Sequence, residues 1–340
     1  MTFEEPMISK LNKLYAKVNT LDASSTDHYR MVDTFRERLY YKDFPVNEKM
    51  TPDFKEQFLN LTRGLDQRSV ETIVLALRRI AKIQSTDERY LSLYNSREAE
   101  EAKVIEEEFQ QQIIELSKDC FYFDGYMLPK NSFEACVFYD RCGAKEIVHP
   151  EKLRNKDIID AGAYIGDSAL FLAEMTDRRV YAFEPTGSNF RDMLKTVELN
   201  AAENIVPVQL GLGREKGQIE MNVSLIASAN TQIRTEGIPY ASVEKADVVT
   251  LDDYAKEHHL DIGLIKVDVE GAEQLLLAGA METIREKKPV LLISIYHNAD
   301  DFFHIKPILE AMDLGYTFKV RHPAIGTVLT ETMLIAEVLD

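Results

Sequence analysis

Five short apolar runs recur between residues 158 and 295, and helical patterns separate several of them. Runs this apolar are typical of parallel strands whose two faces are both covered by helices. Strands and helices in alternation predict an α/β fold with a doubly wound, mostly parallel sheet and right-handed crossovers. The predicted strands span residues 158–161, 180–183, 206–210, 264–267 and 290–295, and the predicted helices span 168–174, 189–200 and 272–280.

Further strand patterns flank this core. An insertion over residues 217–254 contains strand-like pieces at 218–223 and 247–251. Asp124-Gly125, a turn dipeptide, predicts two short strands within residues 120–129. The chain ends with two more strand patterns, 316–321 and 327–338. We expect them to form a hairpin that adds an antiparallel strand to the sheet.

Before residue 119 the apolar residues recur at helical spacing. This change predicts an all-helical N-terminal region, residues 1–118, ahead of a catalytic domain, residues 119–340. Each apolar stripe needs a partner surface, either on the rest of the chain or on a second copy in a homodimer. The stripes are Leu11, Leu14, Val18 and Leu21; Val70, Ile73, Leu77 and Ile80; and Ile105, Phe109, Ile113 and Leu116.

The first candidate site is the stretch IIDAGAYIGDSALFLAEM, residues 158–175. A buried strand ends at an acid, a glycine-bearing turn follows, and a helix then begins with N–H groups free to meet anionic ligand atoms. The spacing is not the G-x-G-x-x-G of dinucleotide sites. A carboxylate can hold the ammonium of S-adenosylmethionine (SAM), so the pattern favours SAM over NAD. The candidate cofactor-binding residues here are Asp160, Gly162, Tyr164, Gly166 and Asp167.

Two later positions extend this candidate site. Glu184 ends the second strand and could accept hydrogen bonds from both hydroxyls of a ribose. Gly211 follows the third strand, where a small residue could let an adenine lie against the backbone. A solvated carboxylate at a strand end is the simpler alternative for Glu184.

Acidic residues also gather at the end of the fourth strand, in LIKVDVEGAEQLLLAGA, residues 264–280. Ligands of open α/β sheets bind at this edge. Asp268 and His297 are the candidate catalytic residues, because methyl transfer to a hydroxyl needs an aligned oxygen and the removal of a proton. With Glu270 they could also hold a divalent ion, but the spacing does not require one, and no metal is assigned.

Charge and composition exclude other classes. The 340 residues carry 57 acids against 40 bases, a net charge of −17, which argues against nonspecific nucleic-acid binding. The three cysteines lack metal-site spacing and are expected as free thiols in a reducing cytosol. No signal-peptide pattern and no apolar run of about 18 residues is present, so we expect a cytoplasmic protein without a membrane span.

DAGAYIGDS, YAFEP and IKVDVEGAE followed by LLLAGA together resemble the FkbM family of SAM-dependent methyltransferases, over roughly residues 119–340. The resemblance implies a Rossmann-like class I methyltransferase sheet, SAM as methyl donor, and O-methylation of a sugar, glycolipid or secondary metabolite. By position it places Asp160, Gly162 and Gly166 on the methionine side of SAM and Glu184 on its ribose. Asp268 would face the donor sulfur and the acceptor.

Two other functions stay open at this point. A nicotinamide-dependent oxidoreductase shares the predicted fold, although the missing G-x-G-x-x-G counts against it. A non-catalytic module could bind SAM, or dock a partner through the helical region, without transferring a methyl group.

Overall fold

The computed structural model describes residues 31–46, 52–93, 96–224, 231–233, 240–322 and 327–339. At its centre lies a seven-stranded sheet in the order β15-β16-β14-β13-β6-β7-β8. All neighbouring strands are parallel except the pairs that β16 makes with β14 and β15. The strands are β6 (Asp157–Ala161), β7 (Val180–Phe183), β8 (Ile205–Val208), β13 (Ile262–Val267), β14 (Val290–Ser294), β15 (Tyr316–Arg321) and β16 (Met333–Val338).

The predicted α/β class and mostly parallel sheet are confirmed, as is the antiparallel strand of the C-terminal hairpin. Within this hairpin it is β16, the last strand, that joins the sheet, and β15 forms the edge. This order agrees with burial, because β16 is buried along almost its whole length, whereas the first four residues of β15 are exposed or half-exposed.

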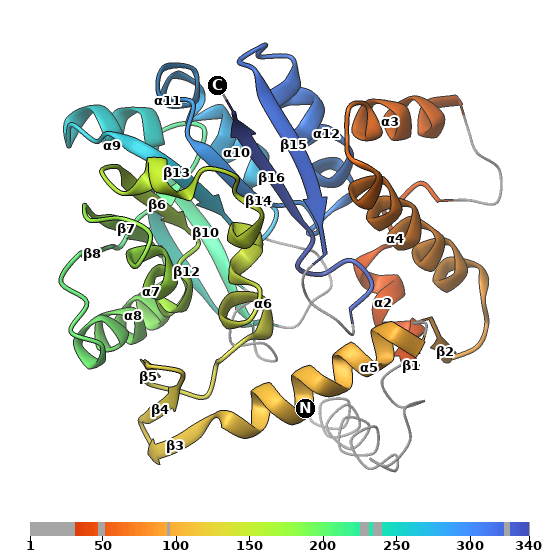
Figure 1. Ribbon diagram of the computed structural model, residues 1–340, viewed down its shortest axis with the longest axis horizontal. Helices are drawn as coiled ribbons and strands as arrows, with labels where there is room; N and C mark the ends of the chain where they lie inside the picture. The colour runs from red at the N-terminus through yellow and green to blue at the C-terminus, as the bar shows by residue number, and fades with distance from the viewer. Residues whose placement is uncertain are drawn as a thin grey trace.

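Helices cover both faces of the sheet (Figure 1). Ile158, Val180 and Leu264 face a core that contains α7 and α8, whereas Ile159, Phe183 and Ile265 face a core that contains α10, α11 and α12. The alternation of adjacent residues between two cores explains why these strands are continuously apolar. The helices are α6 (Ala135–Phe138), α7 (Asp167–Ala173), α8 (Gly187–Leu199), α9 (Leu251–Glu257), α10 (Glu273–Ala278), α11 (Met281–Lys287) and α12 (Ala299–Glu310), with 3-10 turns at Arg141–Glu146 and Pro150–Leu153.

The insertion forms a second sheet beside the carboxyl ends of β6 and β7. Its order is β11-β10-β12-β9, and β12 pairs antiparallel with β10 and parallel with β9. The bounds are β9 (Gly211–Leu212), β10 (Gly217–Ser224), β11 (Thr231–Ile233) and β12 (Tyr240–Val249). The second predicted piece ends earlier than expected, because Thr250 caps α9 and Leu251 is already helical.

The N-terminal helices pack on the rest of the chain. Phe44 and Phe54 share a core with Phe302 and Phe303 of α12, and α3 and α4 lie beside α12 and β15 in Figure 1. Arg321 of β15 fastens this contact, since its guanidinium meets Asp66 Oδ2 at 3.0 Å and the Ser69 hydroxyl at 2.8 Å. The helices are α2 (Thr34–Tyr40), α3 (Pro52–Thr62), α4 (Gln67–Ser85) and α5 (Ser96–Val104).

Two expectations for this region are wrong in detail. It is not all-helical, because β1 (Met31–Asp33) pairs antiparallel with β2 (Tyr90–Ser92). The third apolar stripe is not one helix either. After α5 come a π-helical turn (Ile105–Phe109) and a 3-10 turn (Gln110–Gln112), and Leu116 is exposed in β3 (Ile114–Ser117). The helix ends there because Ile114 and Glu115 pair with β4 instead.

The other two stripes have different outcomes. The one in α4 is confirmed, with Ile73, Leu77 and Ile80 buried, whereas Leu11 to Leu21 lie outside the described residues.

The hairpin at Asp124-Gly125 is confirmed too, between β4 (Cys120–Phe123) and β5 (Tyr126–Leu128), and both turn residues have positive φ. Within the described ranges no helix is long and apolar enough to cross a membrane.

Candidate functional site

The turn after β6 holds two strand ends against each other. Gly162 has φ +78°, and a Cβ there would stand 1.7 Å from the carbonyl oxygen of Asp268, which follows β13. Gly166, with φ +82°, caps α7, and a Cβ there would meet Met193 at 3.0 Å. Glycine is therefore required at residue 162 by a close backbone approach as well as by its φ.

Asp160 and Lys266 form an ion pair beneath this turn. Lys266 Nζ lies 3.1 Å from Asp160 Oδ1 and donates to the Gly162 carbonyl at 3.0 Å. The Ser168 hydroxyl donates to Asp160 Oδ2 at 2.7 Å. The Asp160 side chain is fully buried, so in this structure it fixes the turn through Lys266 and Ser168. Its predicted contact with a ligand ammonium stays a prediction.

Glu184 lies between two residues that line a pocket, Phe183 and Pro185. Its carboxylate accepts hydrogen bonds from the Thr186 N–H at 2.9 Å, the Thr186 hydroxyl at 2.5 Å, and the backbone of Tyr164. Burial raises the pKa of Glu184. Tyr164 itself has a left-handed backbone, φ +49°, and the Lys130 ammonium lies 4.5 Å from its ring centroid. The structure thus joins the predicted residues 164 and 184 through one hydrogen bond.

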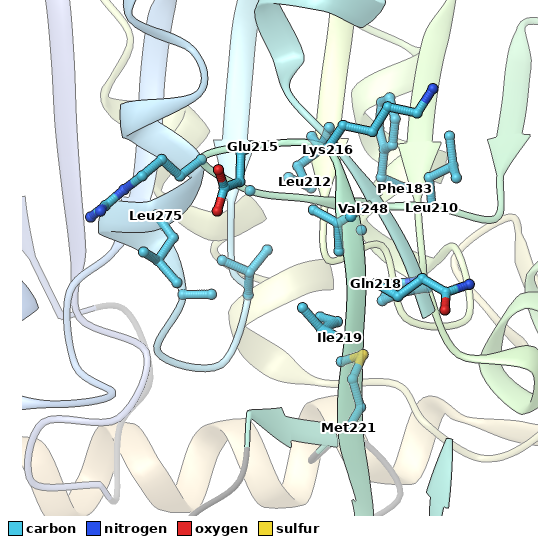
Figure 2. Close-up of a pocket in the computed structure, with 18 of the residues that line it drawn as sticks. Phe183, Leu210, Leu212, Glu215, Lys216, Gln218, Ile219, Met221, Val248 and Leu275 are labelled. Carbon is cyan, nitrogen blue, oxygen red and sulfur yellow. The ribbon is translucent and has the colours of Figure 1, made fainter. Parts of the chain in front are cut away.

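The pocket has a volume of about 310 Å³ and lies between the ends of β6 and β7, the insertion sheet and α10. Gly162 and Gly211, both predicted, contribute to its wall, together with Val269. In Figure 2, Ile219 and Met221 follow one another along the wall formed by β10, with Leu275 on the side of α10. A mostly apolar cavity with glycine backbone in its wall suits a flat heterocycle.

His297 is surrounded by three acidic residues, Asp268, Glu270 and Glu273. His297 Nδ1 lies 2.9 Å from Glu273 Oε1, and Nε2 lies 3.5 Å from Asp268 Oδ1 and 3.6 Å from Glu270 Oε2. Burial acts to lower the pKa of His297, but the three carboxylates outweigh it and raise the pKa to about 10. This contact with three carboxylates favours the charged form of the imidazole. The structure brings the two predicted catalytic residues, Asp268 and His297, together, and their catalytic roles stay predictions.

Further carboxylates, which sequence reasoning missed, lie around Asp268. Glu331 comes from the loop before β16 and Glu134 from the residue before α6, so no motif links them to residue 268. Burial and the charge of Asp268 raise the pKa of Glu331 to about 8. Burial, with Glu134 nearby, raises the pKa of Asp167, another predicted residue, to about 7. We refer to these acidic residues around His297 (Asp167, Asp268, Glu270, Glu273 and Glu331) as the acidic recess; it is an electronegative site suited to a cation or a partial positive charge.

Two residues of this recess have strained backbones. Glu270 has φ +56° and Glu331 has φ +69°. A non-glycine residue in the left-handed region costs about 1–2 kcal/mol. Such strain gathers at functional sites, where it fixes the direction of a side chain.

Comparisons with known proteins find methyltransferases. Residues 160–318 match the methyltransferase FkbM domain. The chain is 27% identical over 186 residues to Methyltransferase 1 of Beauveria bassiana and 26% identical over 195 residues to Methyltransferase sdnD of Sordaria araneosa. These matches cover 49% and 48% of the chain, and 74% of each relative.

The crystal structure of the methyltransferase FkbM from Methylobacillus flagellatus has a similar fold, with a TM-score of 0.52 and 20% identity. The match covers 83% of this chain and 58% of that one, so the chain spans little more than half of that protein. Residues 119–340 make up a smaller share than 83%, so the match also includes residues before 119.

Proposed function

We propose that this chain, whose residues 160–318 match the methyltransferase FkbM domain, transfers a methyl group from SAM to a hydroxyl oxygen of a small-molecule or glycan acceptor. One observation carries the proposal: the apolar pocket and the acidic recess meet at Gly162, whose backbone borders both. A ligand with a flat heterocycle at one end and a positive charge at the other matches the two halves.

The described residues fit SAM in three respects. Gly162 and Gly211 both line the pocket, so a flat ring can approach the main chain there without meeting a side chain from either residue. Glu184 stands in sequence between the pocket-lining residues Phe183 and Pro185, and its carboxylate is the proposed acceptor for the ribose hydroxyls. The buried carboxylates around Asp268 and Asp167 complement a sulfonium and an ammonium group.

When bound, SAM supplies an electrophilic methyl carbon, whose bond to sulfur breaks as its bond to the acceptor oxygen forms. The chain's own residues align the acceptor and receive its proton. Asp268 follows β13 and is 26% exposed, so an acceptor hydroxyl can reach its carboxylate and pass the proton to it. His297 contacts Asp268 and Glu273 together and so holds Asp268 in place as a positioning residue. Alignment of two bound reactants can lower the barrier by about 7 kcal/mol or more.

A methyl-transfer assay tests the proposal. The full chain is incubated with SAM labelled in its methyl group and with hydroxylated acceptors, both defined sugars and metabolites and a cell extract. We expect labelled product from the unaltered chain and a loss of turnover on the order of 10²-fold or more in Asp268→Asn. SAM affinity, measured by calorimetry, should fall much less than turnover in this variant.

The assay also separates the proposal from its alternatives. Tight binding of SAM with no transfer to any acceptor would favour a non-catalytic module. Binding of NADH in place of SAM would favour an oxidoreductase. Equal turnover by Asp268→Asn and the unaltered chain would remove Asp268 from the mechanism.

A further inference from the structure

We propose that His297 and Asp268, together with Glu270, bind a divalent transition-metal ion such as Mn²⁺ or Zn²⁺ in the acidic recess. The ligand atoms of Asp268, Glu273 and His297 lie within 4.8 Å of one another. Acidic clusters are common on protein surfaces without a metal, so the inference depends on the orientation of His297.

Glu273 fixes that orientation. Its Oε1 lies 2.9 Å from His297 Nδ1 and accepts a hydrogen bond from the Val269 N–H, also at 2.9 Å. Glu273 is fully buried at the start of α10, so it cannot turn away. A carboxylate on one imidazole nitrogen is the arrangement that orients histidine ligands in metal sites, because it leaves the other nitrogen aimed at the ion.

Neither ring nitrogen of His297 has a hydrogen-bond partner among the described residues, although the side chain is only 7% exposed; Nδ1 has its close contact with Glu273, whereas the carboxylate neighbours of Nε2 stand further off. Its neighbours, Asp268 Oδ1 and Glu270 Oε2, lie 3.5 and 3.6 Å away. These distances are long for a hydrogen bond. Two ligand atoms that bind one tetrahedral ion at about 2.0–2.2 Å lie about 3.3–3.6 Å apart. The nitrogen and each oxygen thus have the spacing of ligands that share an ion.

The surrounding charges favour the same occupant. Glu134 and Glu331 both lie close enough to Asp268 for its negative charge to raise their pKa values. The nearby cation, Lys266, is already paired with Asp160. Several carboxylates therefore face one another around a single imidazole, which is costly in a buried site. A divalent ion offsets this repulsion, and its binding should release protons from the cluster.

An ion at this position would have an open side. The Asp268 and Glu270 side chains are 26% and 21% exposed, so solvent or an acceptor can approach. Three protein ligands and an open position are typical of catalytic rather than structural metal sites. If the proposed methyl transfer holds, the ion binds and polarises the acceptor oxygen, and Asp268 can receive the proton on its second oxygen. The imidazole ligand favours Mn²⁺ or Zn²⁺ over Ca²⁺.

Metal titration of the full chain tests this inference without an activity assay. After treatment with chelator, Mn²⁺ binding is followed by electron paramagnetic resonance of the free ion, and Zn²⁺ binding by calorimetry. We expect one ion per chain, with affinity lowered at least tenfold in His297→Ala and in Asp268→Asn. Heats measured in buffers of different ionisation enthalpy should show proton release.

His304→Ala is the matched control. His304 Nδ1 lies 2.7 Å from Asp300, an exposed pair on α12 with its own imidazole and carboxylate, and its removal should leave ion binding unchanged. Thermal unfolding checks that each variant is folded. If His297→Ala does not fold, Glu270→Gln, which alters a partly exposed side chain, should still weaken binding.

Two results would overturn the inference: no stoichiometric binding of either ion at millimolar concentration, or equal binding by the unaltered chain and by folded variants at residues 268, 270 and 297. A SAM titration of the same samples separates this failure from that of the proposed function. A chain that binds SAM but no ion removes only the metal site. A chain that binds the ion but not SAM keeps the metal site and removes the donor.

Discussion

Replacing Gly162 with alanine tests whether the contact between the ends of β6 and β13 organises the site. The new Cβ would lie 1.7 Å from the Asp268 carbonyl oxygen, where ordinary contacts exceed 3 Å, so the two strand ends must separate by more than 1 Å. The left-handed backbone, φ +78°, adds about 1–2 kcal/mol, and the overlap about 1–3 kcal/mol. We expect Gly162→Ala to lower the free energy of unfolding by about 2–5 kcal/mol.

Gly64→Ala separates the two contributions. Gly64 also has a left-handed backbone, φ +71°, but a Cβ there meets no atom within 4 Å. This variant should lose only the conformational part, about 1–2 kcal/mol. Urea unfolding measures both stabilities, and calorimetry with SAM measures whether the site survives. If Gly162→Ala were as stable as Gly64→Ala and bound SAM as the unaltered chain does, the contact would not organise the site.

Three further predictions concern His322, Arg321 and Gly211. Burial, and next the charge of Arg79, lower the pKa of His322 to about 4, so the unfolded chain takes up a proton at higher pH than the folded chain does. About 3 kcal/mol of stability should therefore be present above pH 6.5 and be lost by pH 4. In urea unfolding at several pH values, His322→Gln should reduce that loss. Arg321→Met should lower the free energy of unfolding by about 2–3 kcal/mol in the same assay. This is less than the cost of breaking a fully buried ion pair, because the Asp66 side chain is 41% exposed. An unchanged stability would mean that Arg321 does not stabilise the contact between α4 and β15. Gly211→Val adds a branched side chain to the pocket wall and should weaken SAM binding at least tenfold in calorimetry. Its contact with Val248 should also cost about 1–3 kcal/mol of stability, which leaves the chain folded; unaltered SAM binding would place the adenine elsewhere.

The central sheet was predictable because its strands are buried on both faces. β7 is the clearest example, since its predicted and observed bounds are both 180–183. Lys266 is a charged residue within an apolar strand, and the structure explains it, because its partner is the predicted residue Asp160. The order of β15 and β16 in the sheet was not predictable, since it depends on which of the two strands pairs with β14 in the folded chain.

The site could be predicted only where a local pattern specifies it. Gly162 and Asp268 were found from their motifs, but the contact between them depends on how two strands end side by side. Glu134 and Glu331 come from segments far apart in the chain, so only the folded structure brings them to Asp268. The prediction of one helix from Ile105 to Leu116 was wrong, because β3 pairs with β4 although its apolar residues have helical spacing.

Calorimetric titration of the folded chain with SAM tests the central claim most directly. The account predicts binding of one SAM per chain, and a loss of at least tenfold in affinity when Glu184, beside the pocket, is changed to alanine. A folded chain that shows no binding at millimolar SAM would contradict the account, whatever its resemblance to methyltransferases.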